Sequence, residues 1–176
     1  MFLCTRLHVR GLHVRSTVFE SKATVVIHKT DLRVLLYVSH PVLAEVTEFR
    51  LKLSGMHPVA VTSAEMMSAE IDAGLPDAII IDLDVNEGTG VGIVERLASN
   101  EITSRIPILC MSAEADLPHA EEAFAAGASE FLVVPYDPIM LEDKMIAMVK
   151  LAEEEREIRE QSGKGKRTSP RLSVTS

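Results

Sequence analysis

The chain has 176 residues, of which 47% are hydrophobic and 25% charged, a balance typical of one globular domain with tails. Residues 31–150 hold 7 Lys/Arg and 20 Asp/Glu, a net charge of −13 that would repel the phosphates of nucleic acid. No apolar run approaches the ~20 residues that a membrane helix needs. We therefore expect neither nucleic acid nor a membrane as a partner of this region.

Three segments differ in composition. Residues 1–30 carry a net charge of +4 and repeat Leu-His-Val-Arg on either side of Gly11, and we predict a basic, disordered leader there. Residues 31–152 are predicted to form one domain. Residues 153–176 begin with a charged run that predicts an extension of the last helix, followed by a disordered tail. The two cysteines, Cys4 and Cys110, lie in different settings, which favours a reducing compartment such as the cytoplasm.

From residue 31 onward, short apolar runs alternate with stretches of helical spacing. The apolar runs predict strands at residues 34–38, 58–61, 78–81, 106–111 and 131–134. In the first predicted helix, apolar residues recur at the spacing of a helix face: Val42, Leu43, Val46, Phe49 and Leu53. The first two predicted helices are bounded by Pro41 and Gly55 and by Ser63 and Ala73. A third follows the Gly-Thr-Gly loop and runs to about Ser99, a fourth ends at Gly127, and Asp137 caps a last helix that begins at Pro138.

Strands that alternate with helices predict an α/β fold, with a doubly wound, five-stranded parallel sheet and helices on both faces. The carboxyl ends of parallel strands meet at one edge, where ligands bind in such folds. We expect Ser39, Asp82, Ser112 and Val134 at this edge. Asp82 then has two interpretations, a helix-capping or solvated acid, or a reactive or metal-binding acid.

Several motifs in this order resemble the receiver domain of bacterial two-component response regulators, also known as the CheY-like domain. The resemblance covers about residues 32–150 and depends on four stretches: Ile79–Leu83 before a Gly-Thr-Gly loop, and residues 106–113, 126–133 and 135–138. The resemblance implies a flavodoxin-like (βα)5 receiver fold. It also implies that Asp82 is the phosphoacceptor, that Ser112 and Phe131 form the switch, and that the Val134–Pro135 bond is cis.

Two parts of the family pattern are absent, so the resemblance is to an atypical, degenerate receiver. The family has an acidic pair that holds Mg²⁺ where this chain has Val38 and Ser39, and a Lys where it has Val134. Mg²⁺ is thus the cofactor that the family implies, with binding weakened by these losses. Asp84 and Glu87 are candidate acidic neighbours of Asp82 in the following loop. We assign no metal ligands and no catalytic residues.

These observations predict a stand-alone receiver-like signalling protein of a phosphorelay, and not an enzyme. It would contact a sensor kinase or a signalling target through the fourth helix, the fifth strand and the fifth helix, and a homodimer through this face stays open. One alternative is a pseudo-receiver that binds its partners constitutively, without phosphorylation. A second alternative is a flavodoxin-like domain that binds a small ligand, which the lack of a glycine-rich phosphate loop disfavours.

Overall fold

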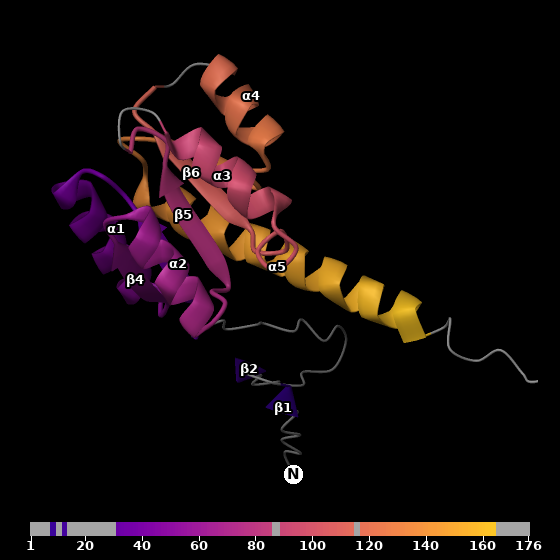
Figure 1. Cartoon of the computed structure of the whole chain (residues 1–176). Helices are drawn as coiled ribbons and strands as arrows, with labels where there is room; N and C mark the ends of the chain where they lie inside the picture. Colours follow the sequence, from indigo (N-terminus) through magenta and orange to yellow (C-terminus); the bar gives the residue numbers. More distant parts are fainter. Residues whose placement is uncertain (1–7, 10–11, 14–30, 86–88, 115–116, 165–176) are drawn as a thin grey trace, which may run out of the picture.

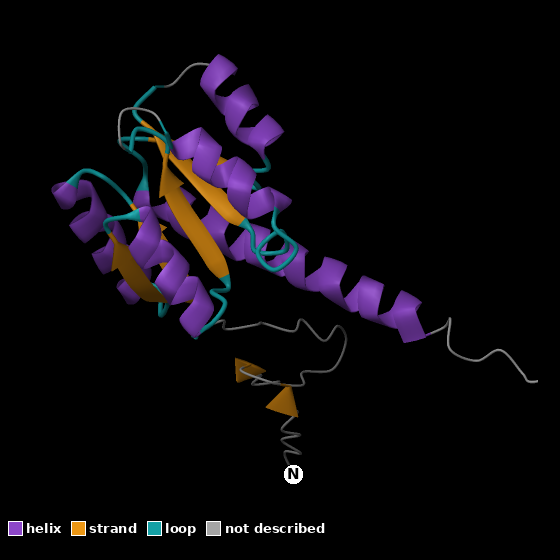
Figure 2. Cartoon of the chain, in the orientation of Figure 1, coloured by secondary structure: helices purple, strands orange, loops and turns teal. Residues whose placement is uncertain are grey.

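The computed structural model describes residues 8–9, 12–13, 31–85, 89–114 and 117–164. Over residues 33–164 the described chain alternates strands and helices, which form a sheet covered by helices (Figure 1; Figure 2). The elements are β1 (His8–Val9), β2 (Leu12–His13), β3 (Arg33–Tyr37), α1 (Pro41–Leu53), β4 (His57–Val61), α2 (Ala64–Ala73), β5 (Ala78–Asp82), α3 (Gly90–Ser99), β6 (Ile108–Ser112), α4 (Leu117–Ala126), β7 (Glu130–Val133) and α5 (Pro138–Lys164). The predicted α/β fold is confirmed.

The five strands of the main sheet are parallel and lie in the order β4-β3-β5-β6-β7. The chain thus starts in the interior of the sheet at β3, moves outward to β4, and then returns to the other side of β3 through β5. This reversal is the topological switch point of a doubly wound sheet, and its crevice lies at the carboxyl ends of β3 and β5. Functional residues are therefore expected among those that end β3 and β5.

Two apolar layers enclose the sheet because strand side chains alternate between its faces. Ile79 and Ile81 of β5 pack in the layer shared with α2, α3 and α4. Ile80, by contrast, packs in the layer shared with α1 and α5, together with Leu51 and Leu141. All five residues of β5 are buried, as expected for a strand in the middle of a parallel sheet.

Several predicted helix boundaries are confirmed, and the structure shows the capping contact or backbone conformation that sets each of them. The Ser63 side chain accepts a hydrogen bond from the Met66 amide and caps α2. The Asp137 carboxylate accepts one from the Ile139 amide at the start of α5. Gly127 follows α4 with a φ of 112°, a conformation that favours glycine and ends the helix. The Val134–Pro135 bond is cis, as the family resemblance implied.

The apolar face of helix α1 points away from the sheet, whereas an amphipathic helix usually packs its apolar face on the sheet. The helix forms as predicted, but Val42, Val46, Phe49 and Leu53 are each at least half exposed. The residues that α1 buries against the sheet are Thr47 and Leu51. The Thr47 hydroxyl is satisfied by the Tyr136 hydroxyl at 2.5 Å, which allows a polar residue on the inner face. The apolar periodicity therefore predicts the helix correctly, but the row of apolar side chains on it faces outward.

Predictions for the two ends of the chain fall largely outside the described residues. Of the predicted leader, only β1 and β2 are described; they pair antiparallel and belong to the two copies of the Leu-His-Val-Arg repeat. Helix α5 runs through the charged segment to Lys164, and residues 165–176 of the predicted tail lie beyond the described chain. Among the described helices, none has both the length and the apolar character required to cross a membrane.

Candidate functional site

The carboxyl edge of the sheet brings together the strand ends expected from the sequence. β5 ends in Asp82, β6 ends in Ser112, and β3 and β7 are followed by Val38-Ser39 and Val134. Asp82 is paired in register with Met111, so Ser112 lies one position beyond it on the neighbouring strand. Asp82 is only 4% exposed, and Ser112 is fully buried.

Neutral donors hold both oxygens of the Asp82 carboxylate. The Ser39 hydroxyl donates to Oδ2 at 2.9 Å, and the Ser39 amide donates to the same oxygen at 3.2 Å. The Asp84 amide donates to Oδ1 at 3.0 Å. None of the ion pairs between described residues involves Asp82. A buried carboxylate is thus satisfied by hydrogen bonds, without a cation.

Sequence reasoning missed the role of Ser39. It was noted as a replacement of an acidic residue, whereas its hydroxyl and amide both bind Asp82. The signal available in the sequence was a serine two residues after β3, at the edge where β5 ends. A hydroxyl there can donate to a carboxylate, while an acid could not do so at neutral pH.

The other predicted site residues are placed as follows. The Asp84 carboxylate turns toward β6 and accepts a hydrogen bond from the Ala113 amide at 3.2 Å. The Ser112 hydroxyl accepts one from the Glu114 amide at 3.0 Å. Phe131 is partly buried against the layer that α2, α3 and α4 cover. Glu87, the second candidate acidic neighbour, lies outside the described residues.

The residues at the family's Mg²⁺ and Lys positions are apolar or neutral. Val38 is buried in the layer shared with α1 and α5, and Val134 packs against the same layer. Mg²⁺ requires several oxygen ligands in octahedral geometry. Within the described part of the chain, no group of three or more His, Cys, Asp or Glu side chains is arranged to hold a metal ion. The described residues around Asp82 therefore lack the acidic pair with which the family holds Mg²⁺.

Gly90 is a further residue of this edge whose role the sequence did not reveal. It is the first residue of α3 and packs against the backbone directly after β5. A Cβ atom on Gly90 would lie 2.5 Å from the Leu83 Cα and 2.8 Å from the Asp82 carbonyl oxygen. Only glycine lets α3 approach the end of β5 this closely.

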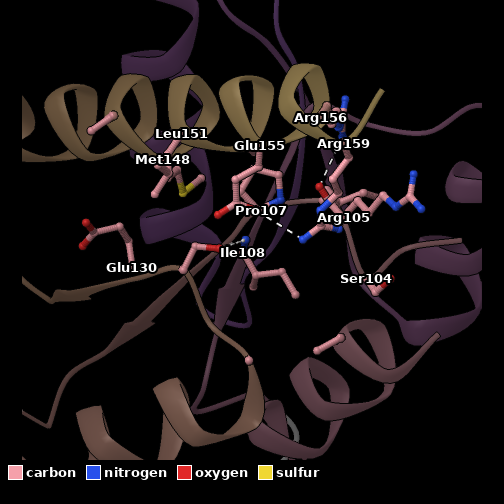
Figure 3. A pocket seen from close by; sticks show the side chains of 16 residues that line it. Ser104, Arg105, Pro107, Ile108, Glu130, Met148, Leu151, Glu155, Arg156 and Arg159 are labelled. Atoms are coloured by element: carbon pink, nitrogen blue, oxygen red, sulfur yellow. Dashed lines mark hydrogen bonds and ion pairs between the residues drawn. The ribbon is translucent and has the colours of Figure 1, made fainter. Parts of the chain in front are cut away.

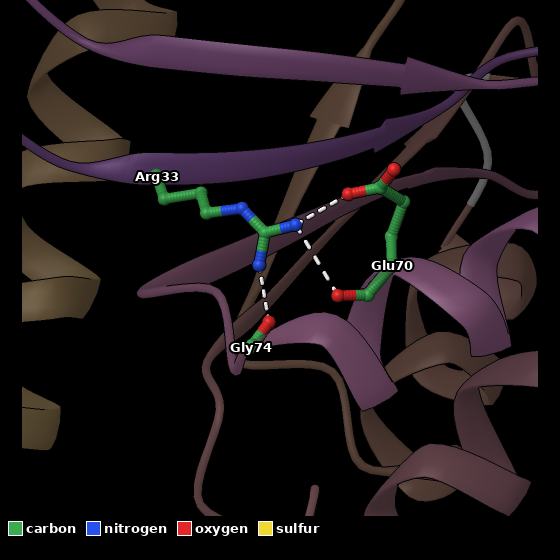
Figure 4. Close-up of polar contacts among 3 residues, drawn as sticks. All are labelled: Arg33, Glu70 and Gly74. Carbon is green, nitrogen blue, oxygen red and sulfur yellow. Dashed lines mark hydrogen bonds and ion pairs between the residues drawn. The ribbon is translucent and has the colours of Figure 1, made fainter.

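At the opposite, amino edge of the sheet, arginines hold the structure together. Figure 4 shows the Arg33 guanidinium between α2 and the turn that follows it. It donates to the Glu70 carboxylate and to the carbonyl oxygens of Glu70 and Gly74. These carbonyls end α2, where a positive charge is favourable. Arg33 thus fixes the start of β3 to the end of α2.

The amino edge also has a cavity of about 230 Å³ below α5, far from Asp82 (Figure 3). Its floor includes Ile108, and its rim carries Arg105, Arg156 and Arg159. The Arg156 guanidinium donates to the Arg105 carbonyl oxygen at 3.2 Å, and Arg159 pairs with Glu155 one turn earlier. The Arg156 contact attaches the extended part of α5 to the domain, whereas the Arg159 pair lies within the helix.

Comparison with known proteins identifies the family. Residues 34–146 match the response regulator receiver domain. The phosphate regulon transcriptional regulatory protein PhoB of Escherichia coli (strain K12) is 21% identical over 118 residues, 67% of this chain and 52% of that protein. The response regulator protein TodT of Pseudomonas putida is 24% identical over 131 residues, 73% of this chain and 57% of that protein. The chain spans about half the length of these curated relatives.

Solved structures share the fold. The receiver domain of the sensor histidine kinase PA1611 from Pseudomonas aeruginosa PAO1, solved with a magnesium ion in its active site cleft, superposes with a TM-score of 0.62 at 22% identity, covering 68% of this chain and 98% of that one. The Vibrio cholerae chemotaxis protein CheY4 gives a TM-score of 0.62 at 21% identity, covering 66% and 98%. Since the family match covers well over half of its residues, this chain belongs to the response regulator receiver domain family of two-component signalling.

Proposed function

We propose that this receiver domain signals through protein–protein contacts that do not require phosphorylation of Asp82. The observation that carries the proposal is the pair of hydrogen bonds from Ser39 to the Asp82 carboxylate. They hold the carboxylate in the buried edge with neutral donors. We assign the module to residues 31–152, which include the family match and all five parallel strands.

The electrostatics of the edge support this proposal. Phosphoryl transfer to a carboxylate depends on positioning and on neutralising the transferring oxygens. In this chain the described neighbours of Asp82 contribute hydroxyl and amide dipoles, and Val38 and Val134 contribute no charge. The PA1611 receiver was solved with magnesium in its cleft, whereas this chain has Val38 and Ser39 in place of the family's acidic pair.

The contact surface that we propose is the face of α4, β7 and α5. Leu117 at the start of α4 is 70% exposed, and Phe124 on the same helix is half exposed. Lys144 of α5 pairs with Glu130 of β7 at 2.5 Å, which fixes α5 to the strand. Met140 lies one turn before Lys144 on the same side of α5 and is half exposed. Adaptable Met and aromatic side chains on one face suit a protein partner such as a sensor kinase or a signalling target.

A second candidate function is phosphorylation of Asp82, with Ser112 and Phe131 as the switch. The placement of Asp82 and Ser112 at the ends of neighbouring strands favours it. In that case a phosphoryl group on Asp82 would attract the Ser112 hydroxyl away from the Glu114 amide, and Phe131 would turn into the space left behind. The prediction that the receiver acts without an attached output domain stays a prediction, as does the small-ligand alternative.

The test is NMR spectroscopy of the whole chain with Mg²⁺, before and after addition of beryllofluoride, a mimic of aspartyl phosphate. We expect no amide shifts centred on Asp82, Ser112 and Phe131 at millimolar Mg²⁺. The matched control is the double variant Ser39→Asp, Val134→Lys, which adds a carboxylate beside Asp82 and a cation at the end of β7. Shifts in the double variant alone would support the proposal.

Shifts in the wild type that are lost in Asp82→Asn would overturn it and favour the phosphoacceptor. A parallel measurement follows partner binding through the proposed face. Phosphate-independent contact predicts that Asp82→Asn binds a partner as well as the wild type does, while Leu117→Glu, on the face itself, binds it less well.

A further inference from the structure

Helix α1 carries a stripe of exposed apolar side chains that the domain does not use. Val42, Val46, Phe49 and Leu53 are between 50% and 63% exposed, although a helix of this kind normally buries its apolar residues. The inner face of α1 is already complete, with Leu51 and Thr47 buried against the sheet and α5. The stripe therefore has no partner within the described domain, and four large apolar side chains in one row are more than scattered surface residues.

The spacing of the stripe is that of a coiled-coil seam. Its members are separated by four, three and four residues, the alternation of the a and d positions of a heptad. A seam of this length on a 13-residue helix matches a partner helix of the same length.

The charges beside the seam differ between the two halves of the helix. Glu45 lies in the amino-terminal half of α1, whereas Arg50 and Lys52 lie in its last turn. Glu48 follows the midpoint of the helix and pairs with Lys52 on the same helix. When two such helices pair antiparallel about a two-fold axis, Glu45 of each copy lies near the basic last turn of the other. With Val42 opposite Leu53 and Val46 opposite Phe49, the flanking Glu45 of each copy faces Lys52 of the other. The surface is thus complementary to itself in one orientation.

We propose that two copies of this chain associate through antiparallel α1 helices. The groove at the end of the helix fits this pairing. A cavity of about 380 Å³ lies between Leu53 and the start of α5, where Ile139 is 67% exposed. In the antiparallel register, Val42 of the second copy lies at this groove. The interface is small, so the association is weak and depends on concentration. It does not depend on the state of Asp82.

Sedimentation velocity of the full chain over a concentration series tests the proposal. The expected result is a mass that rises from 19.3 kDa toward twice that value. Phe49→Glu, which places a charge in the centre of the seam, is expected to weaken self-association at least about tenfold. Leu117→Glu is the matched control, since it changes an equally exposed residue on α4 and is expected to leave the association unchanged.

A charge swap tests the orientation without introducing polarity into the seam. Glu45→Lys and Lys52→Glu each place like charges opposite each other and weaken the dimer, and the double variant restores it. In a parallel pair Glu45 would face Arg50, so the double variant would not recover. Circular dichroism confirms that each variant is folded. A monomer at all concentrations, loss of the dimer in Leu117→Glu but not in Phe49→Glu, or failure of the double variant to recover would each overturn the proposal.

Discussion

The two edges of the sheet differ in the groups that bind their polar side chains. At the carboxyl edge, Asp82 and Asp84 are held by amide and hydroxyl donors, and no ion pair of the described residues involves either. At the amino edge, Arg33 binds the end of α2, and Arg156 binds the Arg105 carbonyl under α5. Among the described residues, cations thus bind where helices are fixed to the sheet, and none of them pairs with the two carboxylates at the carboxyl edge.

The difference indicates how the two edges divide their roles. An arginine at a helix end contributes to the free energy of unfolding through charge-assisted hydrogen bonds. The Asp82 carboxylate is held by neutral donors, two of them from the exposed Ser39, and the described donors offer no positive charge to an incoming anion. Substitutions of polar groups should therefore change stability at the amino edge more than at the carboxyl edge, unless they alter backbone packing.

The largest effect is expected from backbone packing, at Gly90. In Gly90→Ala the new Cβ would lie 2.5 Å from the Leu83 Cα, and α3 must move away from the end of β5. We expect a loss of about 3 kcal/mol in the free energy of unfolding, measured by urea denaturation. The matched control is Gly92→Ala in the same helix, which meets nothing within 4 Å and should be neutral or stabilising. Equal stability of the two variants would contradict the close approach.

Arg33 at the amino edge should have the next largest effect. Arg33→Ala removes the Glu70 ion pair and the Arg33 bonds to the Glu70 and Gly74 carbonyl oxygens, of which that of Glu70 keeps the Gly74 amide as a donor. Since the site is partly exposed, we expect a loss of about 1.5 kcal/mol by urea denaturation. Arg33→Lys keeps the charge but not the planar fork, and should recover only part of the loss. Full recovery by Lys would show that charge alone matters here.

The strands and helix ends could be predicted from the sequence because their causes are local. The apolar run before Asp82 predicts a buried strand, and Ser63 and Gly127 predict helix ends that the structure has. These signals need only a few neighbouring residues, such as a run of β-branched side chains or a hydroxyl that accepts an amide. Because the carboxyl ends of parallel strands meet at one edge, the predicted strands also placed Asp82 and Ser112 together.

What the sequence could not reveal depends on contacts between distant segments. The direction of the α1 stripe depends on Thr47 meeting Tyr136, 89 residues away, and periodicity alone does not show which face lies inward. The role of Ser39 depends on Asp82, 43 residues later, and that of Gly90 on the path of the backbone after β5. Hydrophobic pattern carries no information about such pairs.

Between the two edges, Cys110 in β6 gives a prediction for alkaline pH. Burial raises the pKa of the Cys110 thiol from 9.0 to about 12. The unfolded thiol ionises first, so the contribution to stability is complete below pH 9.0 and is lost as the pH rises toward about 12. From pH 8 to pH 10 we expect the wild type to lose about 1 kcal/mol more than Cys110→Ala does. Parallel pH profiles of the two proteins in urea would contradict a buried thiol.

The smallest effect is expected at Ser39, and it decides the comparison between the edges. Ser39→Ala removes the hydroxyl bond to Asp82 but keeps the amide bond to the same oxygen, and water can replace a hydroxyl at this exposed residue. We expect a loss of about 0.5 kcal/mol by urea denaturation, with Ser39→Thr as the control that keeps the hydroxyl. A loss as large as that of Arg33→Ala would mean that the Asp82 carboxylate is part of the structural framework, because removing one neutral donor would then cost as much as removing an ion pair and two carbonyl bonds.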